Sequence, residues 1–214
     1  GVQTVCIGKG ELDAMGVDVW EVVKAAATKP FGYMPFYPGP GIGGDCIPVS
    51  PVYLSWRAQD VGSSVPIIDL ARANNDGAPD LIANRTAAEL GKRGRAIKGA
   101  RILILGIAYK KDIEDSRESP ALAILNRLED LGADCAYHDP YFPVMPVTRD
   151  HPGLAGRASQ DLATVGAYDA VLVATDHTAV DYAQVARDAK LILDTRNAFA
   201  SRGVAVAGGR LVKV

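Results

Sequence analysis

The chain has few cysteines, no long apolar run and no excess of charge of either sign. Its 214 residues include three cysteines, at positions 6, 46 and 135, which lack the spacing of metal ligands. A disulfide framework and a zinc site are therefore not expected. We expect instead a cytoplasmic protein with reduced cysteines. The longest apolar run, Ile102 to Tyr109, is shorter than the roughly 18 to 20 residues that cross a bilayer. No charged and then apolar segment opens the sequence, so secretion is not expected.

The charge balance excludes a further class of protein. The 23 basic residues are almost matched by 25 acidic ones, and no run of five or six basic residues occurs. Binding to nucleic acid or to a membrane surface is therefore not expected. With 48% hydrophobic and 22% charged residues, the chain has the composition of a globular protein, and its length suits one large domain or two small ones.

The pattern changes near Gly99 and predicts two regions, residues 1–98 and residues 99–214. Apolar spacing predicts a helix over Glu11–Thr28, followed by a loop over Lys29–Val49 that is rich in glycine and proline. A second helix is expected to begin at Ser50-Pro51, a good N-cap followed by a proline. A third, over Val65–Gly94, is expected to be disturbed near Pro79.

The second region alternates short apolar runs with helical stretches, which predicts a parallel sheet covered on both faces, a small Rossmann-like α/β domain. The expected strands are Arg101–Gly106, Asp134–Tyr137, Ala170–Ala174, Leu191–Leu193 and Leu211–Val214, and the expected helices are Pro120–Leu131 and Val180–Arg187. Ligands of such sheets bind outside the carboxyl ends of the strands. Attention therefore turns to Ile107–Ser119 and Asp194–Asn197.

The glycine-rich loop contains a literal GxGxxG at Gly39, Gly41 and Gly44. It fails as a dinucleotide fingerprint, because no strand precedes it and Pro38 and Pro40 crowd it. Two explanations stay open for the glycines. They form either a tight turn without a ligand, or a backbone cradle that approaches a phosphate or sugar.

Cys46 directly follows this loop and precedes the helix expected at Ser50. The positive end of that helix would favour a thiolate, and a thiolate in a partly exposed loop is a plausible nucleophile. The alternative is a small buried hydrophobic residue, which is the commoner role of a free cysteine. A role as a redox sensor is not favoured, because no resolving cysteine lies nearby in the sequence.

A charged loop follows the first expected strand. Ser119 and Pro120 repeat the pairing of an N-cap with a proline, so helix amides are available to an anion there. Lys110, Lys111 and Arg117 could contact a diphosphate; otherwise the loop is simply solvated.

The roles of the remaining polar candidates, Arg196 and the histidines, are less clear from the sequence. Arg196 either joins the same ligand or pairs with Asp194 or Glu118. The three histidines, at positions 138, 151 and 177, are interpreted as structural or surface residues, and the domain shows no NAD signature of its own.

These motifs resemble a known family. The stretch Thr28–Leu54 resembles the cysteine loop of the UDP-glucose/GDP-mannose dehydrogenase family, and Gly106–Ala121 resembles its UDP-binding domain. The later segments His138–Pro140 and Asp194–Asn197 are similar to motifs of the same family. Within this family, the residues of the two motifs resemble those of bacterial UDP-N-acetylglucosamine and UDP-N-acetylmannosamine 6-dehydrogenases. The similarity runs from about Leu12 to the end of the sequence.

The resemblance implies an NAD-dependent oxidation of a sugar C6 alcohol to a carboxylate, in a homodimer joined through the helical region. Cys46 matches the family's nucleophile, which forms a thioester, and Arg117 matches an arginine that reaches NAD. The family holds NAD mainly in an N-terminal domain that is not recognised in these residues. By the same resemblance, the positions expected to bind the UDP-sugar are Tyr37, Gly39, Gly43, Tyr109, Lys110 and Arg196.

One departure from the family keeps a second reading open. The family's aspartate four residues after the cysteine is Ser50 here, and serine cannot act as a carboxylate base. The chain is then either the C-terminal part of a dehydrogenase or a non-catalytic module that binds UDP-sugar or forms a dimer.

Overall fold

The computed structural model describes residues 12–214, so Cys6 and Glu11 lie outside the described residues. The helices are α2 (Val19–Ala26), α3 (Cys46–Asp60), α4 (Pro66–Gly91), α5 (Pro120–Asp130), α6 (Tyr182–Asp188) and α7 (Ala198–Ser201). Two 3₁₀ turns are η1 (Pro152–Leu154) and η2 (Leu162–Ala167). The strands are β1 (Arg101–Leu105), β2 (Asp134–His138), β3 (Ala170–Val173), β4 (Ile192–Asp194) and β5 (Leu211–Lys213).

The second region contains the expected parallel sheet. Its five strands run in the order β2-β1-β3-β4-β5, and each neighbouring pair is parallel. All five strands and the helices α5 and α6 lie where the sequence predicts them, which confirms the α/β fold class. Ser119 also acts as expected, because its side chain accepts a hydrogen bond from the Ala121 amide at the start of α5.

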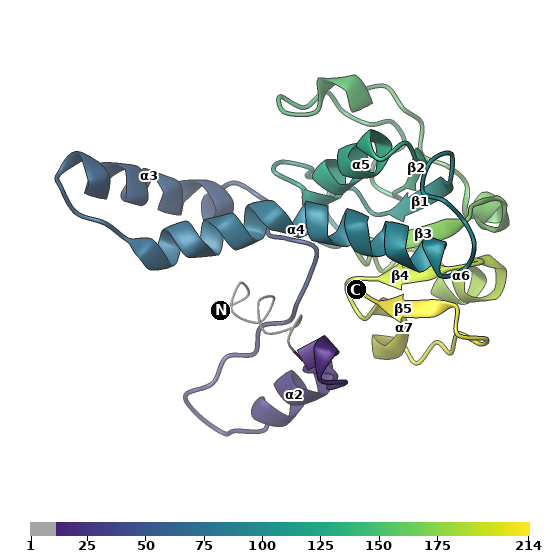
Figure 1. Ribbon diagram of the computed structural model, residues 1–214, viewed down its shortest axis with the longest axis horizontal. Helices are drawn as coiled ribbons and strands as arrows, with labels where there is room; N and C mark the ends of the chain where they lie inside the picture. Colours follow the sequence, from purple (N-terminus) through teal and green to yellow (C-terminus); the bar gives the residue numbers. More distant parts are fainter. Residues whose placement is uncertain (1–11) are drawn as a thin grey trace.

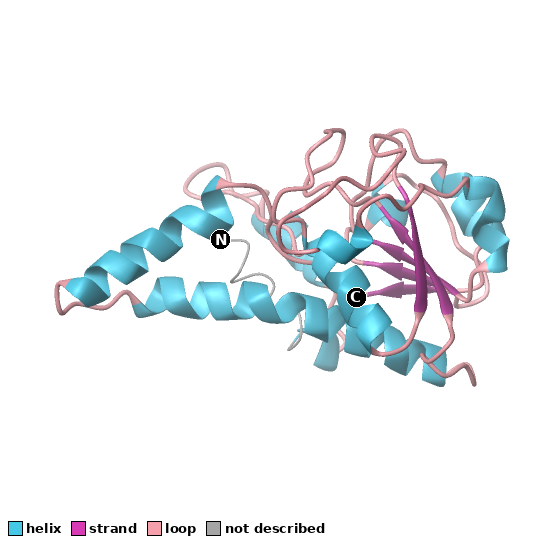
Figure 2. Ribbon diagram, turned by 90° about the horizontal axis from the view of Figure 1, so that it is seen from above, coloured by secondary structure: helices cyan, strands magenta, loops and turns pink. Residues whose placement is uncertain are grey.

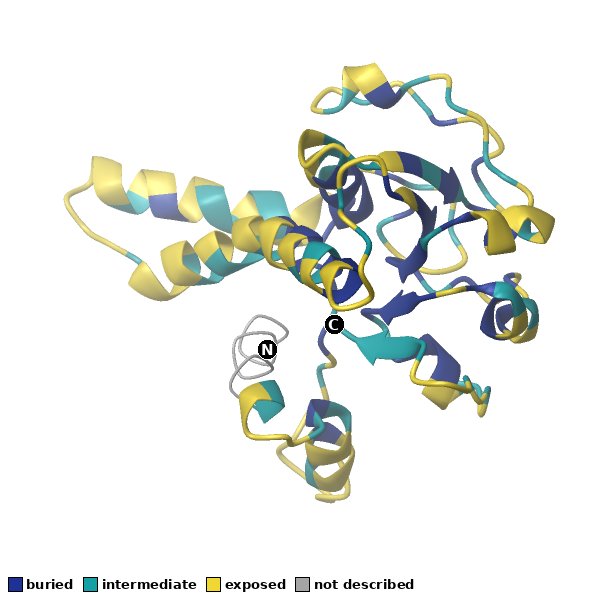
Figure 3. Cartoon of the chain, turned by 45° about the vertical axis from the view of Figure 1, so that its right-hand side comes forward, coloured by how far each residue is buried: buried dark blue, intermediate teal, exposed yellow. Residues whose placement is uncertain are grey.

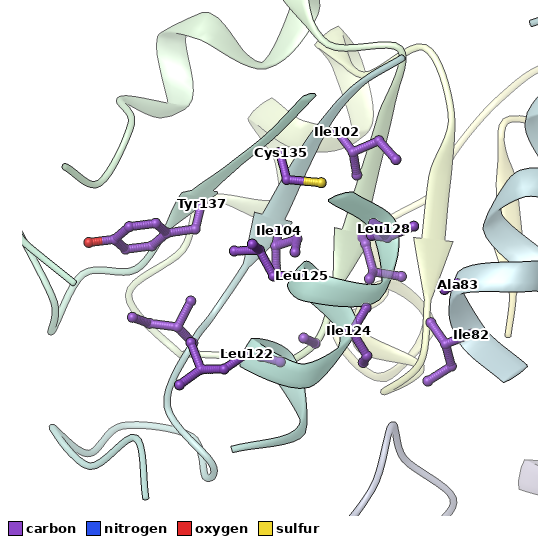
Figure 4. Close-up of a cluster of buried hydrophobic side chains, with 14 of the residues drawn as sticks. Ile82, Ala83, Ile102, Ile104, Leu122, Ile124, Leu125, Leu128, Cys135 and Tyr137 are labelled. Carbon is purple, nitrogen blue, oxygen red and sulfur yellow. The ribbon is translucent and has the colours of Figure 1, made fainter. Parts of the chain in front are cut away.

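Both faces of the sheet are buried, which explains why its strands are continuously apolar (Figure 2). On one face, Ile102 and Ile104 of β1 pack with the apolar sides of α4 and α5, as Figure 4 shows. On the other face, Leu103 and Leu105 pack with α6 and α7. Each such side chain is fully buried, and burial stabilises the fold by about 1.5 to 3 kcal/mol per residue.

Helices α3 and α4 form a hairpin that projects from the sheet (Figure 1). Only the second half of α4 joins the core, through Ile82, Ala83 and Leu90, while most of the hairpin is exposed (Figure 3). The boundary expected between residues 98 and 99 remains a prediction, since α4 precedes it and still packs against α5 of the sheet domain.

The first expected helix is wrong in its extent. A helical turn over residues 12–14 ends at Gly16, whose φ of 73° lies in the left-handed region. Helix α2 then starts separately, with Asp18 accepting a hydrogen bond from the Trp20 amide. Asp18 also pairs with Lys213 of β5 at 2.5 Å, so that α2 is tied to the edge of the sheet.

Two expectations about proline are also wrong. Helix α3 begins at Cys46 rather than at Ser50, because the first amides of a helix need no partner and Pro48 therefore does not end it. Helix α4 runs through Pro79 without interruption. Pro79 is buried at the point where α4 meets the core, and this packing offsets the hydrogen bond that a proline removes.

Candidate functional site at the carboxyl edge of the sheet

The site expected from the topology lies where the strand order reverses. In the order β2-β1-β3-β4-β5 this point falls between the carboxyl ends of β1 and β3. Gly106 follows β1 there with a φ of 81°, and a Cβ on it would lie 2.4 Å from the Thr175 carbonyl oxygen. The two loops therefore approach each other as closely as only glycine allows.

The glycine-rich loop docks onto this edge. A Cβ on Gly43 would lie 2.5 Å from the Glu118 carbonyl oxygen and 2.6 Å from Cβ of Tyr109. The Gly44 amide donates a hydrogen bond to the Arg117 carbonyl at 2.9 Å. Close backbone approach thus explains the glycines, and the surface that the loop approaches is the loop after β1.

Arg196 reaches the same place from the end of β4. Its Nε donates to the Ala174 carbonyl at 2.9 Å, and a Cβ on Gly39 would lie 2.6 Å from Nη1 of its guanidinium. The Arg196 amide donates to the side chain of Asp194, and burial raises the pKa of that carboxyl. Arg196 therefore lies between the end of β3 and the glycine-rich loop.

Cys46 is the first residue of α3 and its side chain is exposed. It stands at the positive end of a 15-residue helix, immediately after the loop that docks on the sheet. Cys135 differs, since it is buried in the core and burial raises the pKa of its thiol to about 12. Of these two cysteines only Cys46 has the exposure that a nucleophile needs.

Arg117 links the charged loop to the residue before Cys46. It pairs with Asp115 at 2.7 Å and with Asp45 at 3.3 Å. The hydrogen bonds with Asp115 raise the pKa of Arg117 and lower that of Asp115. The Arg117 side chain is 64% exposed, so it is accessible to a ligand beside Cys46.

The structure gathers most of the expected site residues and separates one from them. Tyr109 lies half-buried beneath Gly43 and Gly44, and Lys110 next to it is exposed. Tyr37 instead stacks on Trp20 of α2, with ring centroids 5.2 Å apart and planes 13° from parallel.

Asn75 of α4 is a residue that sequence reasoning missed. Its side-chain oxygen accepts a hydrogen bond from the Ile42 amide at 2.7 Å, and its amide group donates to the Ile42 carbonyl at 3.4 Å. The pair of bonds holds the middle of the glycine-rich loop to α4. An asparagine in mid-helix, where its helix propensity is poor, was the signal that could have indicated this role.

Asp139 occupies the position where many α/β proteins hold a phosphate. Its carboxylate accepts hydrogen bonds from the amides of Ile107 at 2.7 Å and Ala108 at 3.2 Å, directly after β1. Burial alone would raise the pKa of Asp139, but hydrogen bonds from His177 and from the Tyr141 and Ile107 amides lower it below its usual value. The amides that would bind a dinucleotide pyrophosphate are thus already used, and residues 12–214 do not form an NAD site of the strand-glycine-helix type.

Within residues 12–214, no cluster of histidine, cysteine, aspartate and glutamate is arranged to hold a metal ion. In the same part of the chain, no helix is both long and apolar enough to cross a membrane.

A parallel doubly wound sheet with a cysteine loop docked on its carboxyl edge defines the class of protein as doubly wound α/β, a class whose ligands commonly bind at the switch point. Two family models match the chain. Residues 10–77 match the central domain, and residues 103–201 the UDP-binding domain, of the UDP-glucose/GDP-mannose dehydrogenase family. The chain belongs to this family.

Individual relatives support the assignment. The chain is 32% identical to the UDP-N-acetyl-D-glucosamine 6-dehydrogenase of Pseudomonas aeruginosa, over 77% of this chain and 37% of that protein. It is 33% identical to the UDP-N-acetyl-D-mannosamine dehydrogenase of Methanococcus maripaludis, over 77% of this chain and 35% of that one. The chain thus spans little more than a third of the length of these relatives.

A solved structure agrees in fold. The UDP-D-ManNAc dehydrogenase of Pyrococcus horikoshii superposes with a TM-score of 0.76 at 27% identity, over 92% of this chain and 44% of that structure.

Proposed function

We propose that these residues are the substrate-binding and nucleophile-bearing part of an NAD-dependent nucleotide-sugar 6-dehydrogenase, one that oxidises the C6 alcohol of a UDP-N-acetylhexosamine to the uronate. The observation that carries the proposal is the docking of the loop before Cys46 onto the carboxyl edge of the sheet, against Tyr109 and Arg196. This contact brings an exposed thiol near cationic side chains from two segments, the loop after β1 and the end of β4.

The negative charge of the proposed ligand is matched by positive side chains around the docked loop. A UDP-sugar carries a diphosphate, and Lys110, Arg117 and Arg196 supply three cationic side chains around the docked loop. Charge-assisted hydrogen bonds to phosphate oxygens are the stronger kind, and the guanidinium fork suits them. Tyr109 and the backbone of Gly39 and Gly43 border the same space and would contact the sugar and nucleotide.

Cys46 is proposed to carry the covalent chemistry. A first oxidation removes hydride from C6 and the proton from its hydroxyl to give the aldehyde. The Cys46 sulfur attacks this aldehyde to give a thiohemiacetal, and removal of a second hydride from that carbon, with the hydroxyl proton, leaves a thioester. Water then cleaves the thioester, which releases the carboxylic acid and returns the thiol. The helix N-terminus at Cys46 would offer backbone N–H groups to the negative charge that develops on the C6 oxygen.

NAD supplies the acceptor for the electrons of both oxidation steps. Since the described residues form no dinucleotide site, we propose that NAD is bound mainly by an N-terminal domain outside these 214 residues. Arg117, exposed beside Asp45 and Cys46, is the residue proposed to reach it from this part of the protein.

Replacement of Lys110 by alanine tests the binding site. We expect the 214-residue chain to bind UDP and UDP-N-acetylglucosamine in calorimetric titration, with no heat from NAD. Loss of the Lys110 ammonium is expected to weaken UDP binding by about 1 to 3 kcal/mol, roughly 5- to 150-fold. Lys98→Ala, which removes an exposed lysine just before β1 at the opposite edge of the sheet, is the matched control and is expected to change the affinity little. Equal losses in both variants would show general charge attraction, and absence of UDP binding by the parent chain would contradict the proposal.

A second candidate function is a non-catalytic UDP-sugar-binding or dimerisation module. The observation that favours it is Ser50, which stands in α3 four residues after Cys46 and leaves the first turn without a carboxylate. This function keeps the binding site and lacks the hydrolysis of the thioester.

Under either function we propose a homodimer joined through the α3–α4 hairpin, in the cytoplasm, where Cys46 stays reduced. The hairpin exposes an unusual number of large apolar side chains. They are Ile47, Tyr53, Leu54, Trp56, Val61, Ile67 and Leu70. Sedimentation velocity is expected to give a dimer for the parent chain and a shift toward monomer for Trp56→Ser. A parent that sediments as a monomer at micromolar concentration would contradict the dimer.

A further inference from the structure

A buried aspartate and histidine lie beneath the loop that carries Lys110, and neither contacts the proposed ligand space directly. His177 has no exposed surface and Asp139 is 2% exposed. His177 comes from the loop after β3, and Asp139 directly follows β2. Their side chains meet where Nε2 of His177 lies 3.0 Å from Oδ2 of Asp139.

The partners of His177 define its tautomer. The Asp112 amide donates a hydrogen bond to Nδ1 at 2.9 Å, so Nδ1 carries no hydrogen. Nε2 then carries it and donates to Asp139. A neutral imidazole has one donor and one acceptor nitrogen, and both are used here.

These bonds hold both ends of a short segment. At one end, the Asp139 carboxylate binds the amides of Ile107 and Ala108. At the other end, His177 binds the Asp112 amide, while the Thr178 amide and hydroxyl donate to the Asp112 carboxylate at 2.7 and 2.6 Å. Between the two ends stand Tyr109, Lys110 and Lys111.

The segment is held in an unfavourable conformation. Asp112 has a φ of 60°, in the left-handed region, which costs free energy for a residue with a side chain, although aspartate tolerates it better than most. Tyr109 and Lys110 lie outside the two hydrophobic clusters, so packing in the core does not set their place. The polar bonds from Asp139, His177 and Thr178, together with the bond from the Tyr109 amide to the Asp115 carbonyl at 3.0 Å, therefore set the position of Lys110.

We propose that His177 is a positioning residue for nucleotide-sugar binding, which acts through the Asp112 amide on the segment that carries Tyr109 and Lys110. This inference rests on the proposed UDP-sugar site and adds to it a residue that does not touch the ligand. Loss of the His177 acceptor would release the segment and weaken binding, while the core of the sheet would stay intact.

Two substitutions separate the roles of the two ring nitrogens. An asparagine oxygen takes the place of Nδ1, so His177→Asn keeps the acceptor for the Asp112 amide. A glutamine amide takes the place of Nε2, so His177→Gln keeps the bond to Asp139 and loses that acceptor. His138→Gln is the control, since His138 contacts the Gln160 carbonyl instead. Calorimetry would measure UDP affinity, and NMR would measure hydrogen exchange of the Asp112 amide without nucleotide.

We expect His177→Gln to weaken UDP binding about five- to tenfold and to speed exchange at Asp112 by a similar factor, the usual effect of one lost hydrogen bond. We expect His177→Asn and His138→Gln to stay within about twofold of the parent chain in both measurements, well inside that loss. The inference would be overturned if His177→Gln kept the UDP affinity and the Asp112 exchange rate of the parent chain. It would also be overturned if His177→Gln and His177→Asn lost UDP affinity equally. If the parent binds no UDP, the proposed function fails by itself, and exchange at Asp112 still decides the positioning role.

Two further measurements serve if the His177 variants do not fold. Thr178 is exposed, and Thr178→Val removes only its hydroxyl bond to Asp112. This variant is expected to speed exchange at Asp112 about twofold or more, as a weaker form of the same release. In the parent chain, ¹⁵N chemical shifts of His177 are expected to show a protonated Nε2 and an unprotonated Nδ1. The opposite tautomer, or unchanged exchange in Thr178→Val, would overturn the inference.

Discussion

A serine in place of Cys46 is expected to stop formation of the sugar acid while UDP-sugar binding stays nearly unchanged. In an active dehydrogenase that carries these residues, the rate of acid formation should fall at least about 10³-fold, as when a covalent nucleophile is removed. The physical reason is that a hydroxyl is a far weaker nucleophile than a thiolate toward the C6 aldehyde. Cys46 is the exposed first residue of α3, and oxygen differs from sulfur there by little in volume, so the fold should tolerate the change.

Mass spectrometry would follow the release of the sugar acid, and calorimetry would measure the affinity for UDP-sugar. Cys135→Ala is the control, because that buried thiol has a pKa of about 12 and should take no part in the reaction. Acid formation at the parent rate in Cys46→Ser would refute the nucleophile. A parent protein that binds UDP-sugar and forms no acid would favour the binding module that Ser50 suggests.

Replacement of Gly106 by alanine is expected to cause the largest loss of stability. Its φ of 81° is unfavourable for a side chain, and the new Cβ would lie 2.4 Å from the Thr175 carbonyl and 2.6 Å from Cβ of Thr175. Left-handed strain and overpacking together cost about 2 to 5 kcal/mol. The free energy of unfolding should fall by that amount, and Tm by roughly 5 to 20 °C for a chain of this length. UDP binding should weaken as well, because Gly106 joins β1 to the segment that holds Lys110.

Gly77→Ala is the matched control for this experiment. Gly77 lies within α4, and a Cβ on it would meet no heavy atom within 4 Å. Alanine should therefore raise stability by about 0.5 to 1 kcal/mol, because glycine in a helix loses more backbone entropy on folding. Thermal and urea unfolding measure both variants. A similar small effect of the two substitutions would contradict the close approach of the loops after β1 and β3.

Much of the sheet domain could be predicted from the sequence, since its signals are local. The strand at β1 is a short run of branched apolar residues, and burial on both faces leaves no room for polar alternation. Ser119 and Pro120 marked the start of α5 correctly, because capping depends on two or three adjacent residues. The carboxyl edge of the sheet, where we expect the ligand, followed from the parallel order alone.

The same local rules failed where packing outweighed them. Ser50-Pro51 has the form of a helix start, yet α3 begins four residues earlier, where the docked glycine loop ends. Gly77 and Pro79 have the form of a break, yet α4 continues because its second half is buried against α5. Gly16, which does end a helical turn, was read as the interior of a helix.

The sequence by itself determined the parallel α/β class, the family motifs around Cys46 and the identity of the cationic side chains near the strand ends. The fold class depends on the period of the apolar residues. The motifs and the cationic side chains depend on which residue types lie close together in the sequence. Only the tertiary structure decided which of those residues meet. Gly43 comes against Tyr109, and Asp112 against His177, across 66 and 65 positions in the chain. Close backbone approach and hydrogen bonds between distant loops leave no periodic trace in a sequence, because each depends on a single residue placed by the whole fold.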